Sequence, residues 1–293
     1  MKLGFIGLGA MGRPMALNLM KRGHEMTVFA RRPASAQALV AAGARLCPTP
    51  TEVATRAEVV FTMVTHSSDV EEVVLGKDGA IHGAASGSVV VDMETIAPGV
   101  ARSVAQALED KGVDMLDAPV SGGPMGAEEA TLSIMVGGKQ AVFERVKPLF
   151  DCLGKTVVHM GDHGAGQVTK ACNQLALLVT AQASAEALTL ARACGLDPAR
   201  VREVMMGGIA ASRVLEFFGK RMADRDFEAG IESRLYHKDL NIVLALAHER
   251  GIALPAAALT MQHVNALVGR GEGRNDLSAL IRIVEGMGAR RPS

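Results

Sequence analysis

The first 162 residues alternate between short apolar runs and longer segments of mixed polarity. Seven runs are rich in Val, Ile, Met and Phe, and they cover residues 2–7, 25–30, 58–64, 88–93, 112–120, 132–138 and 156–161. Short β-branched runs that alternate with helical segments predict βαβ units. Because these runs are almost continuously apolar, the sheet that they form is expected to be buried and mainly parallel.

Strand signals end near Gly164, and the pattern beyond it follows a helical period. The glycines and prolines that interrupt this period predict five or six helices, one of which begins at the N-cap and first-turn pair Asp197-Pro198. The first helix is expected over residues 166–193, about 40 Å long at 1.5 Å per residue. Such a length suggests a spine that joins two domains or forms a dimer contact. The pattern therefore predicts an α/β domain over residues 1–162 and an all-α domain over 163–293.

Composition limits the partners of such a chain. Hydrophobic residues make up 48% and charged residues 21%, but aromatic residues only 3%, so Ala, Val, Leu and 16 Met must fill the cores. Lys plus Arg and Asp plus Glu number 31 each. This balance gives no electrostatic reason to expect nucleic acid or an anionic membrane as a partner.

Cellular location is predicted from three features. The apolar stretch 175–191 contains Gln182, Ser184 and Glu186, which argues against a membrane span. The glycine-broken N-terminus is too short an apolar run for a signal peptide. The four cysteines lack metal-ligand or CxxC spacing, and we expect reduced core thiols in a cytoplasmic protein; they are Cys47, Cys152, Cys172 and Cys194.

A glycine motif, Gly7-x-Gly9-x-x-Gly12, follows the first predicted strand and precedes an amphipathic helix. Gly7 suits a tight turn, Gly9 lets backbone N–H groups approach a pyrophosphate, and Gly12 lets the helix pack closely. The helix N-terminus then faces the phosphates. The sequence thus predicts a Rossmann-type doubly wound domain, with a glycine-rich turn that binds no ligand as the alternative. The predicted cofactor contacts are Gly7, Leu8, Gly9, Ala10, Met11 and Gly12.

The end of the second predicted strand indicates which dinucleotide is bound. An Asp or Glu about 20 residues beyond the glycines usually holds a free ribose 2′-hydroxyl. This chain has Ala30 there, followed by Arg31 and Arg32. Guanidinium groups suit a 2′-phosphate as bidentate donors, so we predict NADP (NADPH) over NAD, with Arg31 as a contact. Two solvated surface arginines are the alternative.

The segment "LDAPVSGG", residues 116–123, ends a predicted strand at its carboxyl edge, where open α/β sheets place ligands. Pro119 stiffens this loop. Ser121, Gly122 and Gly123 leave backbone amides uncovered beside a hydroxyl, a combination that can hold a carboxylate. The same pattern also fits an ordinary turn.

Lys170 lies near the start of the long predicted helix, in "GAGQVTKACNQ". Asn173 and Gln174 follow at i+3 and i+4, on the same helix face. A cation and an amide that face a nucleotide-binding domain suit carbonyl reduction, in which a donor must polarise and protonate the substrate oxygen. A surface lysine that extends into solvent is the alternative.

Four ordered segments resemble the β-hydroxyacid dehydrogenase family over nearly the whole chain. They are "GFIGLGAMGRPMALNL" at 4–19, "DAPVSGG" at 117–123, "GAGQVTKACNQ" at 164–174 and "HKDLNIVLA" at 237–245. Within the family, "VVVDMETIAP", "SAEALTLA" and "DLSAL" are most similar to the tartronate semialdehyde reductase branch.

The resemblance implies roles for individual residues around a cleft between the two domains. Lys170 would be the catalytic acid/base and Asn173 its positioning partner, while Ser121, Gly122 and Gly123 would hold a substrate carboxylate. Met63, Val64 and Thr95 would line the nicotinamide ribose, and Lys238 would reach the cofactor. On the residues alone, Lys238 is equally a surface lysine near a helix start.

The activity implied is NADPH-dependent reduction of a small carboxylated aldehyde to a hydroxy acid, without a metal. Tartronate semialdehyde, reduced to D-glycerate, is the favoured substrate. The alternatives are a 3-hydroxyisobutyrate dehydrogenase, a glyoxylate/succinic semialdehyde reductase and, from another class, a non-catalytic nucleotide-binding module. Family members are commonly dimers or tetramers, so a homodimer or homotetramer is expected.

The chain departs from the family pattern at Ala30, at Ala210-Ala211-Ser212-Arg213 and at Ile231. Two arginines, Arg213 and Arg234, either add charge near the substrate entrance or are solvated.

Overall fold

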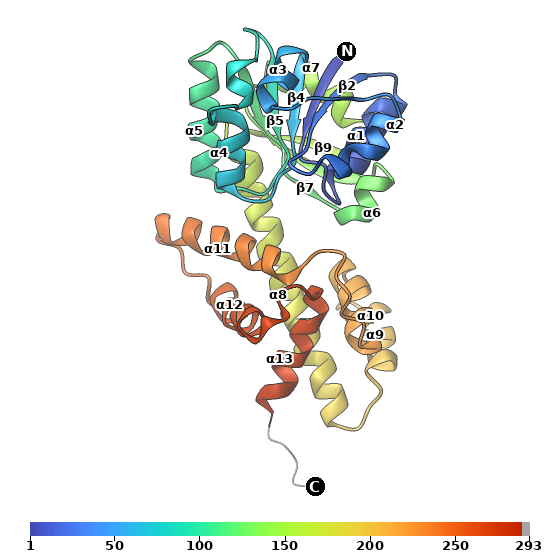
Figure 1. The fold of residues 1–293 in the computed structure, drawn as a ribbon. Helices are drawn as coiled ribbons and strands as arrows, with labels where there is room; N and C mark the ends of the chain where they lie inside the picture. The colour runs from blue at the N-terminus through green and yellow to red at the C-terminus, as the bar shows by residue number, and fades with distance from the viewer. Residues whose placement is uncertain (289–293) are drawn as a thin grey trace. The chain divides into compact units, whose positions relative to one another are not determined.

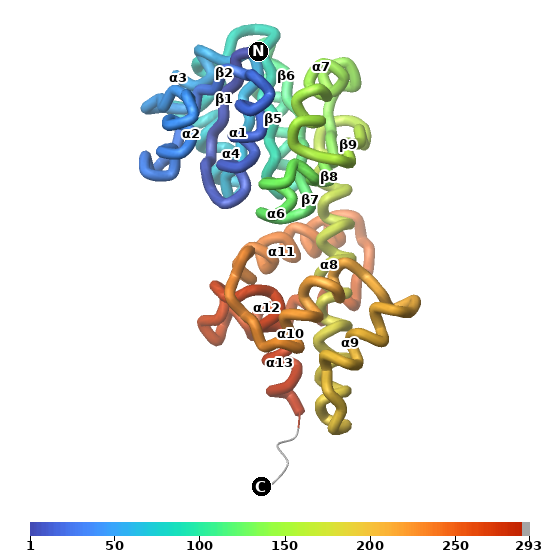
Figure 2. The backbone as a smooth tube through the Cα atoms, turned by 90° about the vertical axis from the view of Figure 1, so that its right-hand side faces the viewer, coloured from blue at the N-terminus to red at the C-terminus, as the bar shows by residue number. Residues whose placement is uncertain are grey.

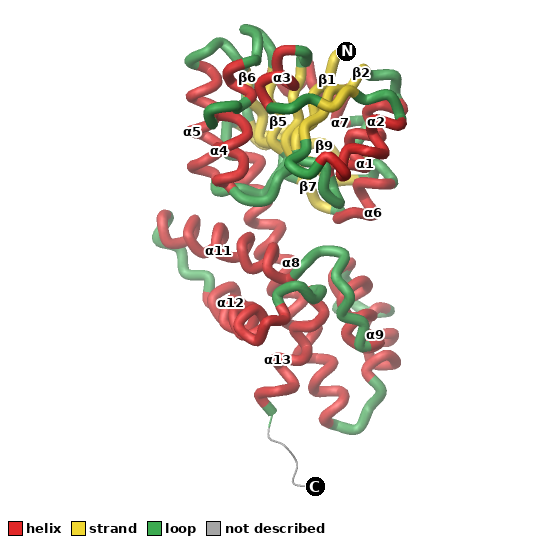
Figure 3. Tube along the Cα trace, in the orientation of Figure 1, coloured by secondary structure: helices red, strands yellow, loops and turns green. Residues whose placement is uncertain are grey.

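The computed structural model describes residues 1–288 and divides into two compact units, Met1–Lys170 and a second unit that begins at Ala171. Figure 3 shows strands in the first unit, whereas the second is built of helices and loops. The strands of the first unit are β1 (Lys2–Ile6), β2 (Glu25–Phe29), β3 (Arg45–Leu46), β4 (Val59–Thr62), β5 (Val89–Asp92), β6 (Asp114–Asp117), β7 (Val120–Ser121), β8 (Leu132–Gly137) and β9 (Gly154–Gly161).

One sheet contains all of these strands in the order β3-β2-β1-β4-β5-β6-β8-β7, with β9 paired to β8. The first six are parallel neighbours, the strand order of a doubly wound dinucleotide-binding fold. Strand β8 runs antiparallel to β6 and to β7, and parallel to β9. The predicted Rossmann-type domain is therefore confirmed, and the chain order reverses between β1 and β4.

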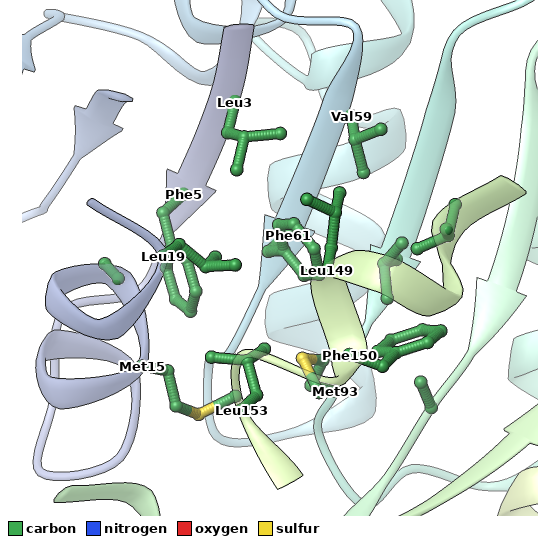
Figure 4. Close-up of a cluster of buried hydrophobic side chains, with 14 of the residues drawn as sticks. Leu3, Phe5, Met15, Leu19, Val59, Phe61, Met93, Leu149, Phe150 and Leu153 are labelled. Carbon is green, nitrogen blue, oxygen red and sulfur yellow. The ribbon is translucent and has the colours of Figure 1, made fainter. Parts of the chain in front are cut away.

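Helices cover both faces of this sheet, because its central strands are apolar on both sides (Figure 1). Phe5 and Phe61 point to one face, where their rings stack 5.9 Å apart and pack against α1 (Gly12–Lys21) and α7 (Gln140–Phe150) (Figure 4). Ile6 and Val60, one position along each strand, point to the opposite face, toward α3, α4 and α5. The helices are α1 (Gly12–Lys21), α2 (Gln37–Ala41), α3 (Pro50–Thr55), α4 (Ser67–Leu75), α5 (Pro98–Glu109), α6 (Gly123–Glu128) and α7 (Gln140–Phe150), with 3-10 turns at Pro33–Ala36 and Ala80–His82.

Helix α8 (Ala165–Ala193) begins in the first unit and has 29 residues, one more at its start than predicted. Its first turn lies directly against the sheet. A Cβ atom on Gly166 would collide with the carbonyl oxygens of Met135 and Asp117, so only glycine allows this close approach. Gly164, with φ +88°, supplies the left-handed turn that leads into the helix.

The second unit has its own core. Leu178, Ala181, Ala185 and Leu188 recur at helical spacing on α8 and are buried with residues of the later helices. Helix α11 (Ser233–Glu249) packs against α12 (Pro255–Leu267), and α12 packs against α13 (Leu280–Met287) (Figure 2). The described residues from α8 onward contain six α-helices, in agreement with the prediction of five or six. Those after α8 are α9 (Pro198–Met206), α10 (Lys220–Asp224), α11 (Ser233–Glu249), α12 (Pro255–Leu267) and α13 (Leu280–Met287), with π-helical turns at Leu215–Gly219 and Val268–Glu272 and a 3-10 turn at Leu277–Ala279.

Three details differ from the predictions. The run 112–120 forms two strands instead of one, because the chain leaves β6 at Ala118 and Pro119 has no N–H to donate to a ladder. Strand β3 was not predicted, since two exposed residues carry no periodic signal. All four cysteines are free, but only Cys47 is buried, so the expectation of core thiols is wrong for the exposed Cys172 and Cys194.

Within residues 1–288, none of the helices combines the length and the hydrophobicity that a membrane span requires.

Candidate active site

The carboxyl ends of β1, β2, β4 and β5 are tied together by backbone hydrogen bonds. The amide of Gly7 donates to Phe29 O at 3.4 Å, and the amide of Met63 donates to Ile6 O at 2.9 Å. The next strand along is joined in the same way, by Met93 N to Thr62 O at 2.9 Å. These bonds surround the point between β1 and β4 where open α/β sheets bind their ligands.

The three glycines of the loop between β1 and α1 have different environments. Gly7 has φ +98°, and a Cβ there would overlap the carbonyl oxygen of Met63. A Cβ on Gly12 would overlap the carbonyl oxygen of Gly7 and the ring of Phe5. Gly9 is exposed, and a Cβ there would have no heavy atom within 4 Å. Packing within the protein thus explains Gly7 and Gly12, whereas the open space at Gly9 fits the approach of a ligand.

This loop fits a dinucleotide pyrophosphate. Helix α1 begins at Gly12, and the first N–H groups of a helix have no intrahelical partner. Gly9 and Ala10 are exposed beside this helix N-terminus, while Leu8 is buried in the core and Met11 is half-buried. The positive end of the helix dipole and the free amides therefore favour a phosphate at this position.

Arg31 lies two residues beyond the end of β2. Its side chain is 71% exposed, and its Nη1 lies 3.5 Å from Oδ1 of Asp69 on α4. Ala30, which replaces the usual acidic residue, packs against the hydrophobic core.

The loop after β5 carries Thr95 and is held by Gln167 in the first turn of α8. Gln167 Nε2 donates to Glu94 O at 2.7 Å, and its Oε1 accepts from the amide of Ile96 at 3.0 Å. Gln167 is only 1% exposed. The first turn of α8 thus positions the loop that contains Thr95. Met63 and Val64 follow β4 directly and are half-buried.

Asp117, the last residue of β6, binds the start of α8. Its two carboxylate oxygens accept from the amides of Gly164, at 2.7 Å, and Gln167, at 3.0 Å. Burial raises the pKa of Asp117 above its ordinary value, and these two amide donors offset only part of that rise. A carboxylate at a helix N-terminus is favoured by the helix dipole. Lys170, 6% exposed, follows Gln167 within the next turn of α8.

Asp92 lies beside Asp117 on the neighbouring strand β5. Its Oδ1 accepts from Thr62 Oγ1 at 2.7 Å, and its Oδ2 has no hydrogen-bond partner in the described structure. Burial is the main cause that raises the pKa of Asp92 to about 8. Asp92 is therefore neutral at pH 7, which spares Asp117 a second buried negative charge.

Ser121, Gly122 and Gly123 end β7 and begin α6. Both glycines have positive φ, +137° and +63°. Helix α6 is held at its other end by Asn18 of α1, whose Nδ2 donates to the carbonyl oxygen of Ala127 at 2.8 Å. Asn18 is 8% exposed, so one buried amide connects the helix of the glycine loop to the helix of the Ser-Gly-Gly loop.

In the second unit, four polar side chains form a network between α8 and α11. Asn173 Nδ2 donates to Gln174 Oε1 at 2.9 Å, and Gln174 Nε2 donates to Asp239 Oδ2 at 2.5 Å. Lys238 Nζ lies 3.3 Å from Asp239 Oδ1. Gln174 and Asp239 are buried, at 3% and 7% exposed, so this network fixes Asn173 and Lys238 on their helices.

Arg213, Arg234 and Ile231 have local partners. Arg213 forms an exposed ion pair with Glu216 at 2.7 Å, and Arg234 pairs with Glu232. Ile231 packs against the core of the second unit. Exposed ion pairs of this kind contribute little to stability.

Sequence analysis assigned no role to Asn18, Asp92, Asp117, Gln167 or Asp239, all of which are buried and polar. Asp92 and Asp117 end apolar strands, and this position alone was a signal, since a buried carboxylate needs partners. In the part of the chain that the structure describes, no group of three or more His, Cys, Asp or Glu side chains is arranged to hold a metal ion.

Comparison with known proteins agrees with this geometry. Residues 2–161 match the family described as the NAD binding domain of 6-phosphogluconate dehydrogenase. Residues 164–284 match the family described as NAD-binding of NADP-dependent 3-hydroxyisobutyrate dehydrogenase. The chain is 44% identical over 285 residues to 2-hydroxy-3-oxopropionate reductase of Escherichia coli, with 97% of each chain covered.

Two further relatives cover the chain equally well. It is 35% identical over 291 residues to the NAD-dependent L-serine dehydrogenase of Pseudomonas aeruginosa, covering 97% of this chain and 98% of that protein. The crystal structure of 3-hydroxyisobutyrate dehydrogenase from Salmonella typhimurium matches with a TM-score of 0.89 and 30% identity, covering 96% of this chain and 99% of that chain.

The fold and the glycine loop define an NAD(P)-dependent oxidoreductase with a Rossmann-type domain and a helical second domain. The chain belongs to the 3-hydroxyisobutyrate dehydrogenase-like family of β-hydroxyacid dehydrogenases, as its sequence motifs predicted. Enzymes of this family act on a CH–OH group or the corresponding aldehyde.

The different environments of Gly9 and Gly12 predict different mutant phenotypes. Gly12→Ala should lower the free energy of unfolding by about 1–3 kcal/mol, because the new methyl group collides with backbone atoms. Gly9→Ala should change the free energy of unfolding by less than about 0.5 kcal/mol but raise the dissociation constant for the nicotinamide dinucleotide at least tenfold. Urea unfolding and the fluorescence of the bound reduced cofactor measure the two quantities. Equal losses of stability in both variants would contradict the assignment.

The buried carboxyl of Asp92 predicts a pH-dependent stability. Its pKa is about 8 when folded against an ordinary value of 3.8, so the folded chain binds one more proton than the unfolded chain between these values. Its contribution to stability is therefore complete below about pH 4 and is lost as pH rises toward 8. As pH rises from 5 to 7, the free energy of unfolding of Asp92→Asn should increase relative to that of the wild type by up to about 1.4 kcal/mol per pH unit. Parallel curves of unfolding free energy against pH would disprove this.

Proposed function

We propose that this enzyme reduces a small carboxylated aldehyde with NADPH, and that tartronate semialdehyde, converted to D-glycerate, is its substrate. The observation that carries the proposal is the start of α8, which binds the loops after β5 and β6 and carries the buried Lys170. The similarity to 2-hydroxy-3-oxopropionate reductase of E. coli supports the choice of substrate.

When bound, NADPH supplies the hydride that reduces the aldehyde carbon. Lys170 would hold the substrate oxygen by an N–H of its ammonium group and donate that proton as the alcohol forms. Ser121, Gly122 and Gly123 would orient the substrate through its carboxylate, since the hydroxyl and the backbone amides of this loop are suitable donors. Asn173 would position Lys170 or the substrate, because it lies on the same face of α8 at i+3 and is fixed by Gln174.

The cofactor contacts belong to the same proposal. The amides of residues 7–12 would hold the pyrophosphate, Arg31 would hold the 2′-phosphate, and Met63, Val64 and Thr95 would line the nicotinamide ribose. Lys238 would reach the cofactor from α11, oriented by Asp239. We assign residues 1–162 to NADP binding and 163–293 to substrate binding and dimerisation, in a cytoplasmic homodimer or homotetramer.

Lys170→Ala should lower kcat by about 10²–10⁴-fold, the usual contribution of a positioned proton donor. NADPH binding, measured by cofactor fluorescence, should survive. Lys170→Arg should not restore kcat, because a guanidinium is effectively never deprotonated. Lys147→Ala, which removes an exposed ammonium from α7, is the matched control and should retain full activity. Full turnover in Lys170→Ala would show that another group is the acid.

Initial rates with a panel of aldehydes test the substrate. Tartronate, succinic and methylmalonic semialdehydes and glyoxylate are each assayed against NADPH and NADH. We expect the highest kcat/KM for tartronate semialdehyde with NADPH. A preference for methylmalonic semialdehyde would indicate a 3-hydroxyisobutyrate dehydrogenase, and a preference for succinic semialdehyde or glyoxylate would indicate the neighbouring reductases. No turnover of any of these aldehydes would favour a non-catalytic nucleotide-binding module.

A further inference from the structure

Arg31, the residue to which we assign the 2′-phosphate, already has an anionic partner in the protein. Its Nη1 lies 3.5 Å from Oδ1 of Asp69, in the first turn of α4. A charge-assisted hydrogen bond between such groups usually measures about 2.7–2.9 Å. The contact is therefore longer than a strong charge-assisted hydrogen bond.

The two partners differ in how firmly the surrounding protein holds them. Asp69 is 18% exposed, and its Oδ2 accepts from the amide of His66 at 3.0 Å as part of the capping box of α4. Its carboxylate is thus fixed at the start of a helix. The Arg31 side chain is 71% exposed, so it can turn to another anion at little cost in lost packing.

We propose that Asp69 competes with the 2′-phosphate of NADPH for Arg31 and so sets how strongly the enzyme prefers NADPH over NADH. This inference rests on the proposed role of Arg31. A phosphate that takes Arg31 must replace the Asp69 carboxylate, so part of its binding free energy is spent on breaking that ion pair. NADH has a free 2′-hydroxyl, so its binding does not require this exchange.

A positioning role for Asp69 is the competing explanation, and the geometry argues against it. A residue that orients a guanidinium for a ligand typically does so with a short or bidentate bond, which leaves the rest of the fork fixed. Here the contact measures 3.5 Å and the arginine side chain is mostly solvated. Breaking an ion pair of this kind changes an equilibrium constant, here the dissociation constant for NADPH, by no more than about fivefold.

The test is a double-mutant cycle of Asp69→Asn and Arg31→Ala in the full-length enzyme, with dissociation constants for NADPH and NADH measured by cofactor fluorescence. Asparagine keeps an oxygen that accepts from the His66 amide but loses the charge. Asp69→Asn should tighten NADPH about two- to fivefold and leave NADH unchanged, and the gain should disappear when Arg31 is alanine. Glu71→Gln, an exposed carboxylate on the same helix, is the matched control and should change neither constant.

Other outcomes overturn the inference in distinguishable ways. Weaker NADPH binding in Asp69→Asn would show that Asp69 positions Arg31. Unchanged binding, or a gain that persists in Arg31→Ala, would show that the two residues do not compete through their ion pair. If Arg31→Ala itself binds NADPH as well as the wild type does, the proposed role of Arg31 fails and the inference fails with it.

Discussion

The bond between Asp117 and the start of α8 is the interaction on which the rest of the candidate site depends. A carboxylate at the end of β6 accepts two backbone amides of the helix, and burial alone would make such a charge costly. Three features offset that cost: the helix dipole, the two hydrogen bonds, and the neutral state of neighbouring Asp92. Gly166 allows the close contact, since any side chain there would push the helix away from Asp117 and Met135.

The same turn of α8 also organises the loop after β5. Gln167 donates to Glu94 and accepts from Ile96, so the loop with Thr95 and the helix that carries Lys170 are held as one piece. On the other side of the sheet's carboxyl edge, Asn18 connects α1 to α6 and thereby the glycine loop to the Ser-Gly-Gly loop. Three buried side chains, Asp117, Gln167 and Asn18, thus hold the loops of the first unit that carry most of the proposed ligand contacts.

Much of this arrangement could be predicted from the sequence, because its signals are local. The apolar runs located the seven longer strands, and helical periodicity located α8 to within one residue at its start. The glycine spacing predicted the loop before α1. Asp117, Gln167 and Asn18 could not be assigned, because their partners lie 47 to 109 residues away and no local pattern encodes such pairs. The raised pKa of Asp92 likewise depends on strands that meet only in the folded sheet. The proposed roles of Lys170 and Asn173 rest on their spacing on one helix face and on the family resemblance.

The most direct test is a crystal structure of the enzyme with NADP⁺ and D-glycerate at low pH, where the reverse oxidation, which releases a proton, is disfavoured and the product complex accumulates. The central claim is that the start of α8 presents Lys170 to the reacting oxygen. We predict that Nζ of Lys170 lies within hydrogen-bond distance, about 3 Å, of the hydroxyl that replaces the aldehyde oxygen. The carboxylate should contact the Ser121–Gly123 loop. A complex in which another side chain holds that hydroxyl, with Lys170 directed away from it, would contradict the account.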